Sequence, residues 1–373
     1  MTPPAAASPL AVLPRELSGD AVIARRTSEL VGSTPLLELV RTGSGTRLLL
    51  KLEQLNPTGS CKVRMARQMV LEAEADGRLR PGGRIVEPTS GNTGLGLALV
   101  ALERGYRFTA IVDRHAAKDK LRAMEAMGAE LVVVEADPTA GPSSIERRRV
   151  AAQIAAETGA FHPDQHNNPG NANGYGDLAD ELIDQLGTFD VLVAALGTGG
   201  SLCGTVRGLR SRGVMAQSVA VEPRGSIVFG GEPGVYHQTG AGSPAGFPIG
   251  CNVDRDVIDI DHRVGDGDAF ATARVVARRT GLLLGGTTGG AIHVALRHLV
   301  LWPAGSTVVV LCNDAGEKYL DSVYDDDWLA ARGVLDEPAH RRVRRWLNAY
   351  DESVRVADDD RASRRSEMGG LTA

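Results

Sequence analysis

The sequence is poor in the residues that mark secreted, metal-binding or nucleic-acid-binding proteins. It has only four cysteines in 373 residues, and no two of them form a C-x-x-C pair: they are Cys61, Cys203, Cys251 and Cys312. This scarcity favours reduced cytosolic thiols over a disulfide framework or a zinc site. The formal net charge is −5, so the chain lacks the basic excess that a nucleic-acid-binding surface needs.

Long apolar segments are missing as well. No hydrophobic run approaches the ~20 residues of a membrane-spanning helix, and residues 1–7 lack the charged and apolar regions of a signal peptide. We therefore expect a cytoplasmic protein with no membrane partner. His162 and His166 are four residues apart, but Pro163 disfavours a helix that would present both to one ion. No metal site is predicted.

Aromatic residues make up only 4% of the chain, whereas short apolar runs alternate regularly with helical patterns. The runs are rich in Val, Ile and Leu on both faces, which is typical of strands buried in a parallel sheet. They are Leu48–Leu52, Arg84–Val86, Phe108–Val112, Leu131–Val134, Val191–Leu196, Val219–Val221 and Val308–Leu311. Helical spacing is found at Met65–Glu74, Leu95–Leu102, Lys118–Met127, Ile145–Glu157, Leu202–Leu209, Ala269–Thr280 and Ala291–Leu299. The predicted class is α/β.

The alternating units fall into two groups, which predicts two α/β domains with parallel sheets. We expect a smaller, mobile N-terminal domain over 47–155 and a larger one built from 20–46 and 156–345. The Pro- and Gly-rich segment 137–144 is a candidate linker. Residues 354–373 are charged and poor in apolar side chains, which predicts a disordered tail. Asp325–Asp327 is predicted to be a solvated loop or a helix N-terminus.

Lys62 follows a Pro/Gly turn and begins a helical segment, within the stretch Asn56–Arg64. The first turn of a helix carries partial positive charge, and both this field and desolvation favour the neutral amine. A neutral lysine is a nucleophile that can form a Schiff base with a carbonyl. Taken alone, the stretch is equally consistent with an ordinary solvated lysine.

Three glycine-rich loops also precede helical segments. Gly197–Ser201 can cradle a phosphate through backbone N–H groups and two hydroxyls, although a purely conformational role for its glycines is an alternative. Because its spacing is neither G-x-G-x-x-G nor a P-loop, a single terminal phosphate is favoured. Thr89–Gly94 has more hydroxyls than a helix cap needs, which favours a carboxylate ligand. Gly285–Gly290 is equally consistent with a ligand loop and a capped helix.

These parts occur in an order that resembles fold-type II pyridoxal 5′-phosphate (PLP) enzymes of the cysteine synthase group, which have a tryptophan synthase β-like fold. The likeness extends from Val31 to about Leu329. It includes Val31–Leu36, Lys51–Glu53, Asn56–Arg64, Thr89–Gly94, Gly197–Ser201, Val221–Pro223, Pro244–Pro248 and Gly316–Leu320. The resemblance implies PLP as cofactor, amino-acid substrates, and a homodimer in which the smaller domain closes over the substrate.

The resemblance also implies a role for each site residue. Lys62 would hold PLP as a Schiff base, Asn92 would hydrogen-bond the O3′ atom, and Thr287 would meet the pyridine nitrogen. The phosphate would be bound by Gly197, Thr198, Gly199, Gly200 and Ser201. The amino-acid carboxylate would be held by Thr89, Ser90, Thr93 and Gln165.

Because Thr287 is a neutral hydroxyl, the electron sink is weaker than one with a carboxylate partner. This suits β-elimination, with Lys62 taking the Cα proton. The implied reaction is β-replacement, by a transferase, on O-phospho-L-serine or O-acetyl-L-serine through an α-aminoacrylate. Four departures from the family pattern bear on the substrate. Val63 replaces the usual acidic residue, Cys61 stands where a small apolar residue is common, Thr287 replaces the commoner serine, and Asn313–Ala315 differs slightly from the pattern.

Several segments resemble a branch that makes N-(2-amino-2-carboxyethyl)-L-glutamate, a 2,3-diaminopropionate precursor in natural-product biosynthesis. They are Val112-Asp113, Gly225–Gly230, Gly285–Gly289, Tyr319–Tyr324 and Asp327–Leu329. We therefore expect L-glutamate as the nucleophile, with a sulfide-using cysteine synthase as the alternative. A serine/threonine dehydratase shares the fold but normally carries His at the position of Thr93. Arg224 is a candidate ligand for a phosphate or carboxylate, although a surface arginine is favoured.

Overall fold

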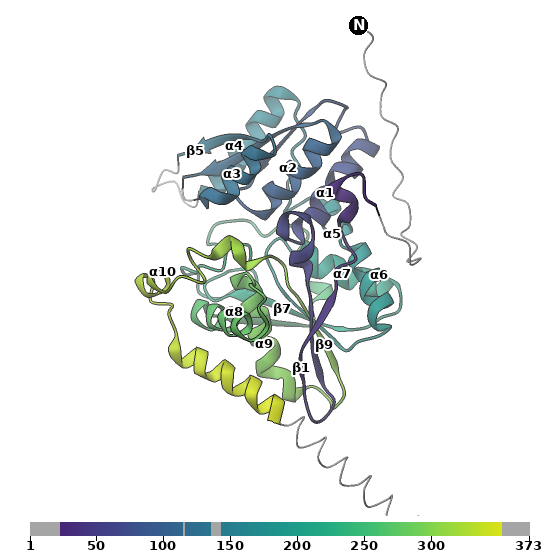
Figure 1. The fold of residues 1–373 in the computed structure, drawn as a ribbon. Helices are drawn as coiled ribbons and strands as arrows, with labels where there is room; N and C mark the ends of the chain where they lie inside the picture. The colour runs from purple at the N-terminus through teal and green to yellow at the C-terminus, as the bar shows by residue number, and fades with distance from the viewer. Residues whose placement is uncertain (1–22, 115, 136–142, 353–373) are drawn as a thin grey trace, which may run out of the picture.

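The computed structural model describes residues 23–114, 116–135 and 143–352, which form two α/β units stacked on each other (Figure 1). Most of the candidate linker 137–144 lies outside these residues, as does the predicted tail 354–373. The N-terminal turn, η1, covers Thr27–Leu30. No helix of the described ranges is long and apolar enough to cross a membrane.

The larger unit is built on a six-stranded sheet with the order β1-β2-β9-β6-β7-β8. All neighbouring strands are parallel except β1 and β2, which form an antiparallel hairpin at one edge. The strands are β1 (Leu36–Arg41), β2 (Arg47–Lys51), β6 (Val191–Ala195), β7 (Gln217–Pro223), β8 (Ile260–Val264) and β9 (Thr307–Leu311). Every residue of β6 and β9 is buried, as expected for apolar strands covered on both faces.

The smaller unit contains a parallel sheet of β3 (Arg84–Pro88), β4 (Arg107–Asp113) and β5 (Glu130–Val134). All seven predicted apolar runs are strands. The boundary expected at residue 47 is wrong, however, because β2 pairs with β9 of the larger sheet. A buried apolar run carries no local signal of the sheet that it joins. The rest of the predicted division into domains remains a prediction.

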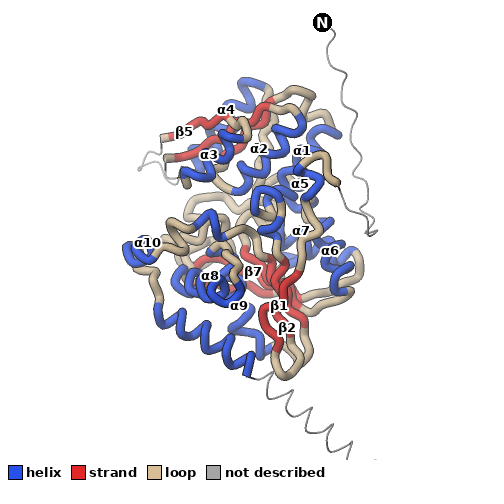
Figure 2. Tube along the Cα trace, in the orientation of Figure 1, coloured by secondary structure: helices blue, strands red, loops and turns tan. Residues whose placement is uncertain are grey.

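Helices cover both faces of each sheet (Figure 2). They are α1 (Lys62–Ala75), α2 (Asn92–Arg104), α3 (Lys118–Ala126), α4 (Ser143–Thr158), α5 (Pro169–Asn173), α6 (Gly176–Leu186), α7 (Gly200–Ser211), α8 (Asp266–Thr280), α9 (Gly286–His298) and α10 (Asp326–Ala331), followed by helical residues 337–352. The seven predicted helical segments are all helices. Asp325 caps α10 by accepting from the Trp328 N–H, which confirms the helix N-terminus predicted at Asp325–Asp327.

Two strands were not predicted, for different reasons. In β8, partly buried and exposed residues alternate before the buried Val264, and the sequence is Ile-Asp-His-Arg-Val, so it lacks the continuous apolar run that marked the other strands. In β1, the apolar residues lie in a hairpin at the sheet edge rather than in an alternating βα unit. Both strands lie at the edges of the larger sheet, where burial is lowest.

Helix α1 joins the two units. Met65 and Met69 pack in the apolar cluster of the larger unit, which includes Leu192 and Leu202. Ala66 and Val70, on the other face of α1, belong to a cluster of the smaller unit. Since both faces of the helix are buried, its N-terminus is fixed at the junction of the units, and Lys62 lies there.

Candidate active site

Four helix N-termini carry the loops singled out in the sequence. Helices α1, α2, α7 and α9 begin after Cys61, Gly91, Gly199 and Gly285, and none of these N-cap residues makes a side-chain cap hydrogen bond. The first N–H groups of a helix have no partner within it and attract anions. For Gly285–Gly290, one alternative was a capped helix. The N-cap residue Gly285 does not form such a cap.

The segment Asn313–Ala315, which follows β9, connects three of these loops. The Asn313 carbonyl accepts from the Cys61 N–H at 2.9 Å, next to Lys62. The Asp314 carbonyl accepts from the Gly285 N–H at 3.1 Å, close to Thr287. The Asp314 carboxylate accepts from Asn92 Nδ2 at 2.7 Å. The structure thus brings Lys62, Asn92 and the start of α9 around one segment, at the carboxyl edge of the sheet where α/β folds place their ligands.

Lys62 is half-buried in the first turn of α1. The turn before it is tight, because Thr58 and Gly59 have φ of 66° and 64°. Two residues beyond it, the buried Arg64 pairs with Glu53 at 2.7 Å and with Glu181 at 2.9 Å, which anchors the start of the helix. No hydrogen-bond or ion-pair partner of Lys62 Nζ is found among the described residues.

The glycines of the predicted phosphate loop are required by close packing. A Cβ on Gly197 would lie 2.5 Å from the Gly240 carbonyl oxygen, and one on Gly199 would lie 2.4 Å from that of Asn252. A Cβ on Gly200 would lie 2.0 Å from Asn171 Oδ1. These glycines therefore do serve the backbone geometry, as the alternative interpretation proposed. Without side chains, they let the loop pack closely against the segments that carry Asn171 and Asn252.

The same loop also fits a phosphate. Thr198 and Ser201 are both 7% exposed. Thr198 Oγ1 accepts from Asn171 Nδ2 at 2.9 Å, which leaves the threonine hydroxyl hydrogen free to donate to a ligand. Together with the uncapped N–H groups of α7, these hydroxyls form a set of donors suited to a phosphate monoester.

The predicted carboxylate ligands meet at the start of α2. Thr93 Oγ1 donates to Gln165 Oε1 at 2.7 Å. Thr89 Oγ1 accepts from the Gly94 N–H at 3.0 Å, and Ser90 Oγ accepts from Arg147 Nη1 at 3.0 Å. Thr89 therefore does assist the helix start, as the capping alternative suggested. Both hydroxyls and the Gln165 amide keep hydrogens to donate, which is the chemistry that binds a carboxylate.

The buried Glu87 supports the Gln165 loop, and the half-buried His166 lies next to Gln165 in it. Glu87 is 1% exposed and accepts from the N–H groups of Asp164 and Gln165 at 3.0 and 3.3 Å. Burial raises the pKa of Glu87 to about 8. Burial also lowers the pKa of His166 to about 4, with the Arg148 charge acting in the same direction.

Thr287 and Thr288 lie side by side in the first turn of α9 but differ in their contacts. Thr288 Oγ1 accepts from the Asn313 N–H at 3.1 Å, which ties α9 to the central segment. Thr287 is 5% exposed, and no hydrogen bond of its hydroxyl is found in the part of the chain that the structure describes. Arg224, in contrast, is exposed, which agrees with its interpretation as a surface arginine.

Sequence reasoning missed Asp314 and Lys318 as site residues. The side chains of Asn92 and Asp314 are 222 positions apart and in contact, and Lys318 Nζ donates to Asn92 Oδ1 at 2.7 Å. The available signal was that Asp314 closely follows the buried parallel strand β9, because the ends of such strands meet at one edge. Within the described ranges, no cluster of His, Cys, Asp or Glu is arranged to hold a metal.

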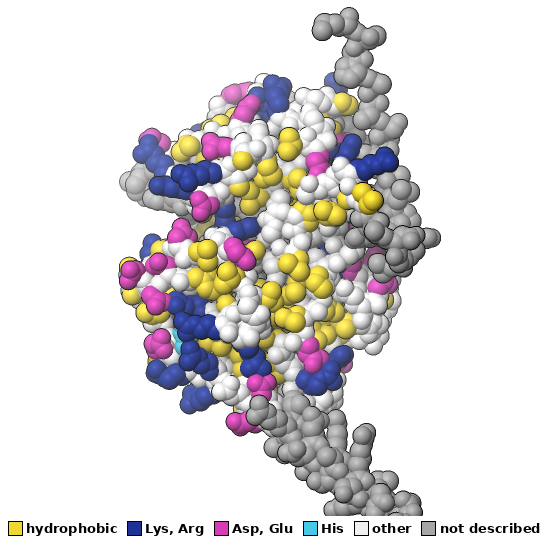
Figure 3. Space-filling view, in the orientation of Figure 1, with side chains coloured by type: hydrophobic (Ala, Val, Ile, Leu, Met, Phe, Trp, Pro, Cys, Tyr) yellow, Lys and Arg dark blue, Asp and Glu magenta, His cyan; other side chains and the backbone are white. Residues whose placement is uncertain are grey.

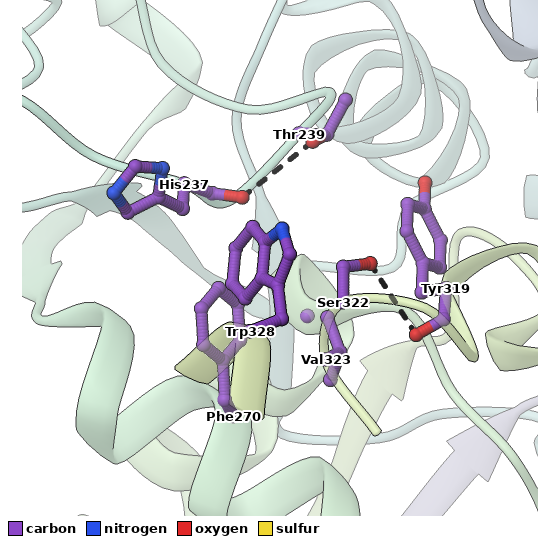
Figure 4. A pocket seen from close by; sticks show the side chains of 8 residues that line it. His237, Thr239, Phe270, Tyr319, Ser322, Val323 and Trp328 are labelled. Carbon is purple, nitrogen blue, oxygen red and sulfur yellow. Dashed lines mark hydrogen bonds between the residues drawn. The ribbon is translucent and has the colours of Figure 1, made fainter. Parts of the chain in front are cut away.

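A small surface pocket lies beside this network. Figure 4 shows Tyr319 at its wall, with the rings of Trp328 and Phe270 nearby. Its remaining lining residues are His237, Thr239, Gly286, Ser322 and Val323. Figure 3 shows that acidic and basic side chains are interspersed on the face in view, which fits the nearly balanced composition.

This fold and donor set define a PLP enzyme, and the chain belongs to the pyridoxal-phosphate dependent enzyme family, whose profile matches residues 27–314. Within that family it is similar to cysteine synthases and related β-replacement enzymes. A protein of Sinorhizobium fredii named "Putative cysteine synthase" is 47% identical, over 86% of this chain and 96% of the relative.

Two further relatives are named for other products. N-(2-amino-2-carboxyethyl)-L-glutamate synthase of Ralstonia nicotianae is 36% identical, over 83% of this chain and 92% of the relative. The crystal structure of O-ureido-L-serine synthase aligns with a TM-score of 0.75 and 31% identity, over 83% of this chain and 100% of that one. The predicted fold class and the PLP cofactor are confirmed.

Proposed function

We propose that this chain catalyses PLP-dependent β-replacement on an O-activated L-serine, with L-glutamate as the nucleophile and a 2,3-diaminopropionate precursor as the product. The observation that carries the reaction class is the convergence of Lys62, Asn92 and the start of α9 on Asn313–Ala315. This arrangement gives PLP a covalent anchor, a donor for O3′ and a neutral hydroxyl, Thr287, for the pyridine nitrogen.

The substrate carboxylate binds at the start of α2. The Thr89 and Ser90 hydroxyls and the Gln165 amide donate to it, and Thr93 fixes the amide by occupying Gln165 Oε1. Arg147 adds positive charge behind Ser90 while pairing with Asp113 at 3.4 Å. The carboxylate is thus oriented by donors from two segments, the start of α2 and the Gln165 loop, which holds the Cα–H bond in a fixed direction.

Lys62 transfers the proton. Bound PLP supplies the electron sink that stabilises negative charge at Cα. The buried Arg64–Glu53 pair anchors the start of α1, and the Lys62 amine at that start would take the Cα proton. The leaving group then departs from Cβ, and the nucleophile adds at the same carbon.

The similarity to the relative named N-(2-amino-2-carboxyethyl)-L-glutamate synthase supports L-glutamate as the nucleophile. The smaller unit also offers cationic side chains near the carboxylate loop, since Arg147 contacts Ser90 and Arg148 pairs with Asp164. A dicarboxylate nucleophile benefits from such charges, whereas sulfide does not need them.

Sulfide is the second candidate nucleophile, because the relative at 47% identity is named for cysteine synthesis. The deciding experiment offers O-phosphoserine or O-acetylserine to the purified holoenzyme, with glutamate or sulfide, and identifies products by mass spectrometry. Formation of the glutamate adduct supports the proposal. Turnover with sulfide alone removes the glutamate assignment, and release of pyruvate without a nucleophile indicates a dehydratase.

We further propose a cytoplasmic homodimer whose smaller unit closes over the substrate. Exposed apolar side chains such as Leu30, Leu55 and Leu102 support a covered surface. Light scattering at several concentrations measures the assembly, and a monomeric mass throughout would contradict the dimer.

A further inference from the structure

The side-chain ammonium of Lys318 donates all three of its hydrogen bonds to the loops that are predicted to bind the cofactor. It lies in η6 (Gly316–Tyr319), and its Nζ donates to the Thr58 carbonyl at 2.6 Å, the Gly59 carbonyl at 3.0 Å and Asn92 Oδ1 at 2.7 Å. An ammonium group has three hydrogens, so each one has an acceptor. One side chain therefore links the turn before Lys62 to the helix start that carries Asn92.

The turn held by Lys318 is strained. Thr58 has φ of 66°, which is unfavourable for a β-branched residue. Its own hydroxyl oxygen is buried without a hydrogen-bond partner in the described structure. Gly59 leaves room for the lysine, because a Cβ there would lie 3.3 Å from Lys318 Cε. Backbone strain beside Lys62 thus coincides with two hydrogen bonds from Lys318 to the strained segment.

The same contact fixes the orientation of the Asn92 amide. An ammonium only donates and a carboxylate only accepts, so Oδ1 of Asn92 must face Lys318 and Nδ2 must face Asp314. Asp314 is held in turn by the Tyr319 hydroxyl at 2.5 Å. One Asn92 hydrogen then remains to donate to a ligand oxygen. Without Lys318, Asn92 Oδ1 would lose this donor, and Asp314 alone would hold the amide.

We propose that Lys318 is a positioning residue, which sets the Lys62 turn and the Asn92 amide in the arrangement that binds PLP. The inference rests on the proposed roles of Lys62 and Asn92 and is independent of the nucleophile. Tyr319 extends the network to the smaller unit, because Lys120 Nζ lies 4.1 Å from the centre of its ring.

The test compares PLP affinity, measured by titrating the apoenzyme, in Lys318→Met, Lys318→Arg and the wild type. Loss of hydrogen bonds to a charged group predicts about tenfold to hundredfold weaker PLP binding in K318M. It also predicts a changed visible absorption band and partial recovery in K318R. Lys118→Met, at an exposed lysine, is the matched control and should bind PLP as the wild type does.

A double-mutant cycle with Asn92→Ala separates positioning from general stabilisation. If Lys318 acts through Asn92, the two losses of PLP affinity are less than additive. Additive losses, or K318M affinity and spectrum equal to the wild type, overturn the inference. If K318M does not fold, the cycle is run with Lys318→Gln. A wild type that binds no PLP would instead contradict the proposed function.

Discussion

Thr93 Oγ1 donates to Gln165 Oε1 at 2.7 Å, which ties the first turn of α2 to the loop before α5. The bond leaves the Gln165 amide hydrogens facing away from Thr93, and the Glu87 carboxylate supports the same loop through two backbone N–H groups. Two segments thus place the Gln165 side chain, which we propose donates to the substrate carboxylate.

Thr93→Val keeps the shape of the side chain and removes this bond. Because Gln165 then loses its fixed orientation, we expect the KM for the O-activated serine to rise about tenfold, which corresponds to ~1.4 kcal/mol. PLP affinity should not change. Steady-state kinetics measure the effect, with Thr158→Val in the exposed turn of α4 as the control. An unchanged KM would exclude Gln165 as a carboxylate ligand.

Gly200→Ala tests the phosphate loop. The added Cβ would lie 2.0 Å from Asn171 Oδ1, and Asn171 cannot move freely because its Nδ2 donates to Thr198 and to the Gln165 carbonyl. Overpacking of this kind costs about 1–3 kcal/mol, and we expect PLP binding to weaken with it.

The matched control is Gly176→Ala at the start of α6, where a Cβ meets no atom within 4 Å. Thermal unfolding and PLP titration of both variants measure the difference. Equal behaviour of G200A and G176A would mean that the contact of Gly200 with Asn171 is not required.

Glu87 predicts a pH dependence of stability. Its folded pKa is raised to about 8 by burial, above the ordinary value of 4.5. The contribution of Glu87 to the free energy of unfolding is therefore fully present below about pH 4.5. It is lost as the pH rises through 8, because the folded protein must then bury a carboxylate.

Glu87→Gln removes this titration. The free energy of unfolding in urea, measured at several pH values across this window, should fall with rising pH more steeply in the wild type than in E87Q. Other titrating groups are common to both proteins, so the difference isolates Glu87. Parallel profiles would show that Glu87 is ionised in the folded protein throughout.

The sequence predicted the parts of the site that are local in the chain. Lys62, the Thr89–Gly94 loop and Gly197–Ser201 each stand out because glycines and hydroxyls gather before a helical pattern. The roles of Asp314 and Lys318 were not predictable in this way, since their partners lie 222 and 226 positions away. Such contacts depend on which strands pair, and that information is absent from a single buried apolar run such as β2.

The most direct test of the central claim is borohydride reduction of the PLP-loaded enzyme, followed by peptide mass spectrometry. Reduction converts a Schiff base into a stable bond and so marks the lysine that carried it. The account predicts the pyridoxyl label on Lys62, and loss of the label and of the visible band in Lys62→Ala. Label on Lys318 or Lys120 instead, or an unchanged band in K62A, would contradict it.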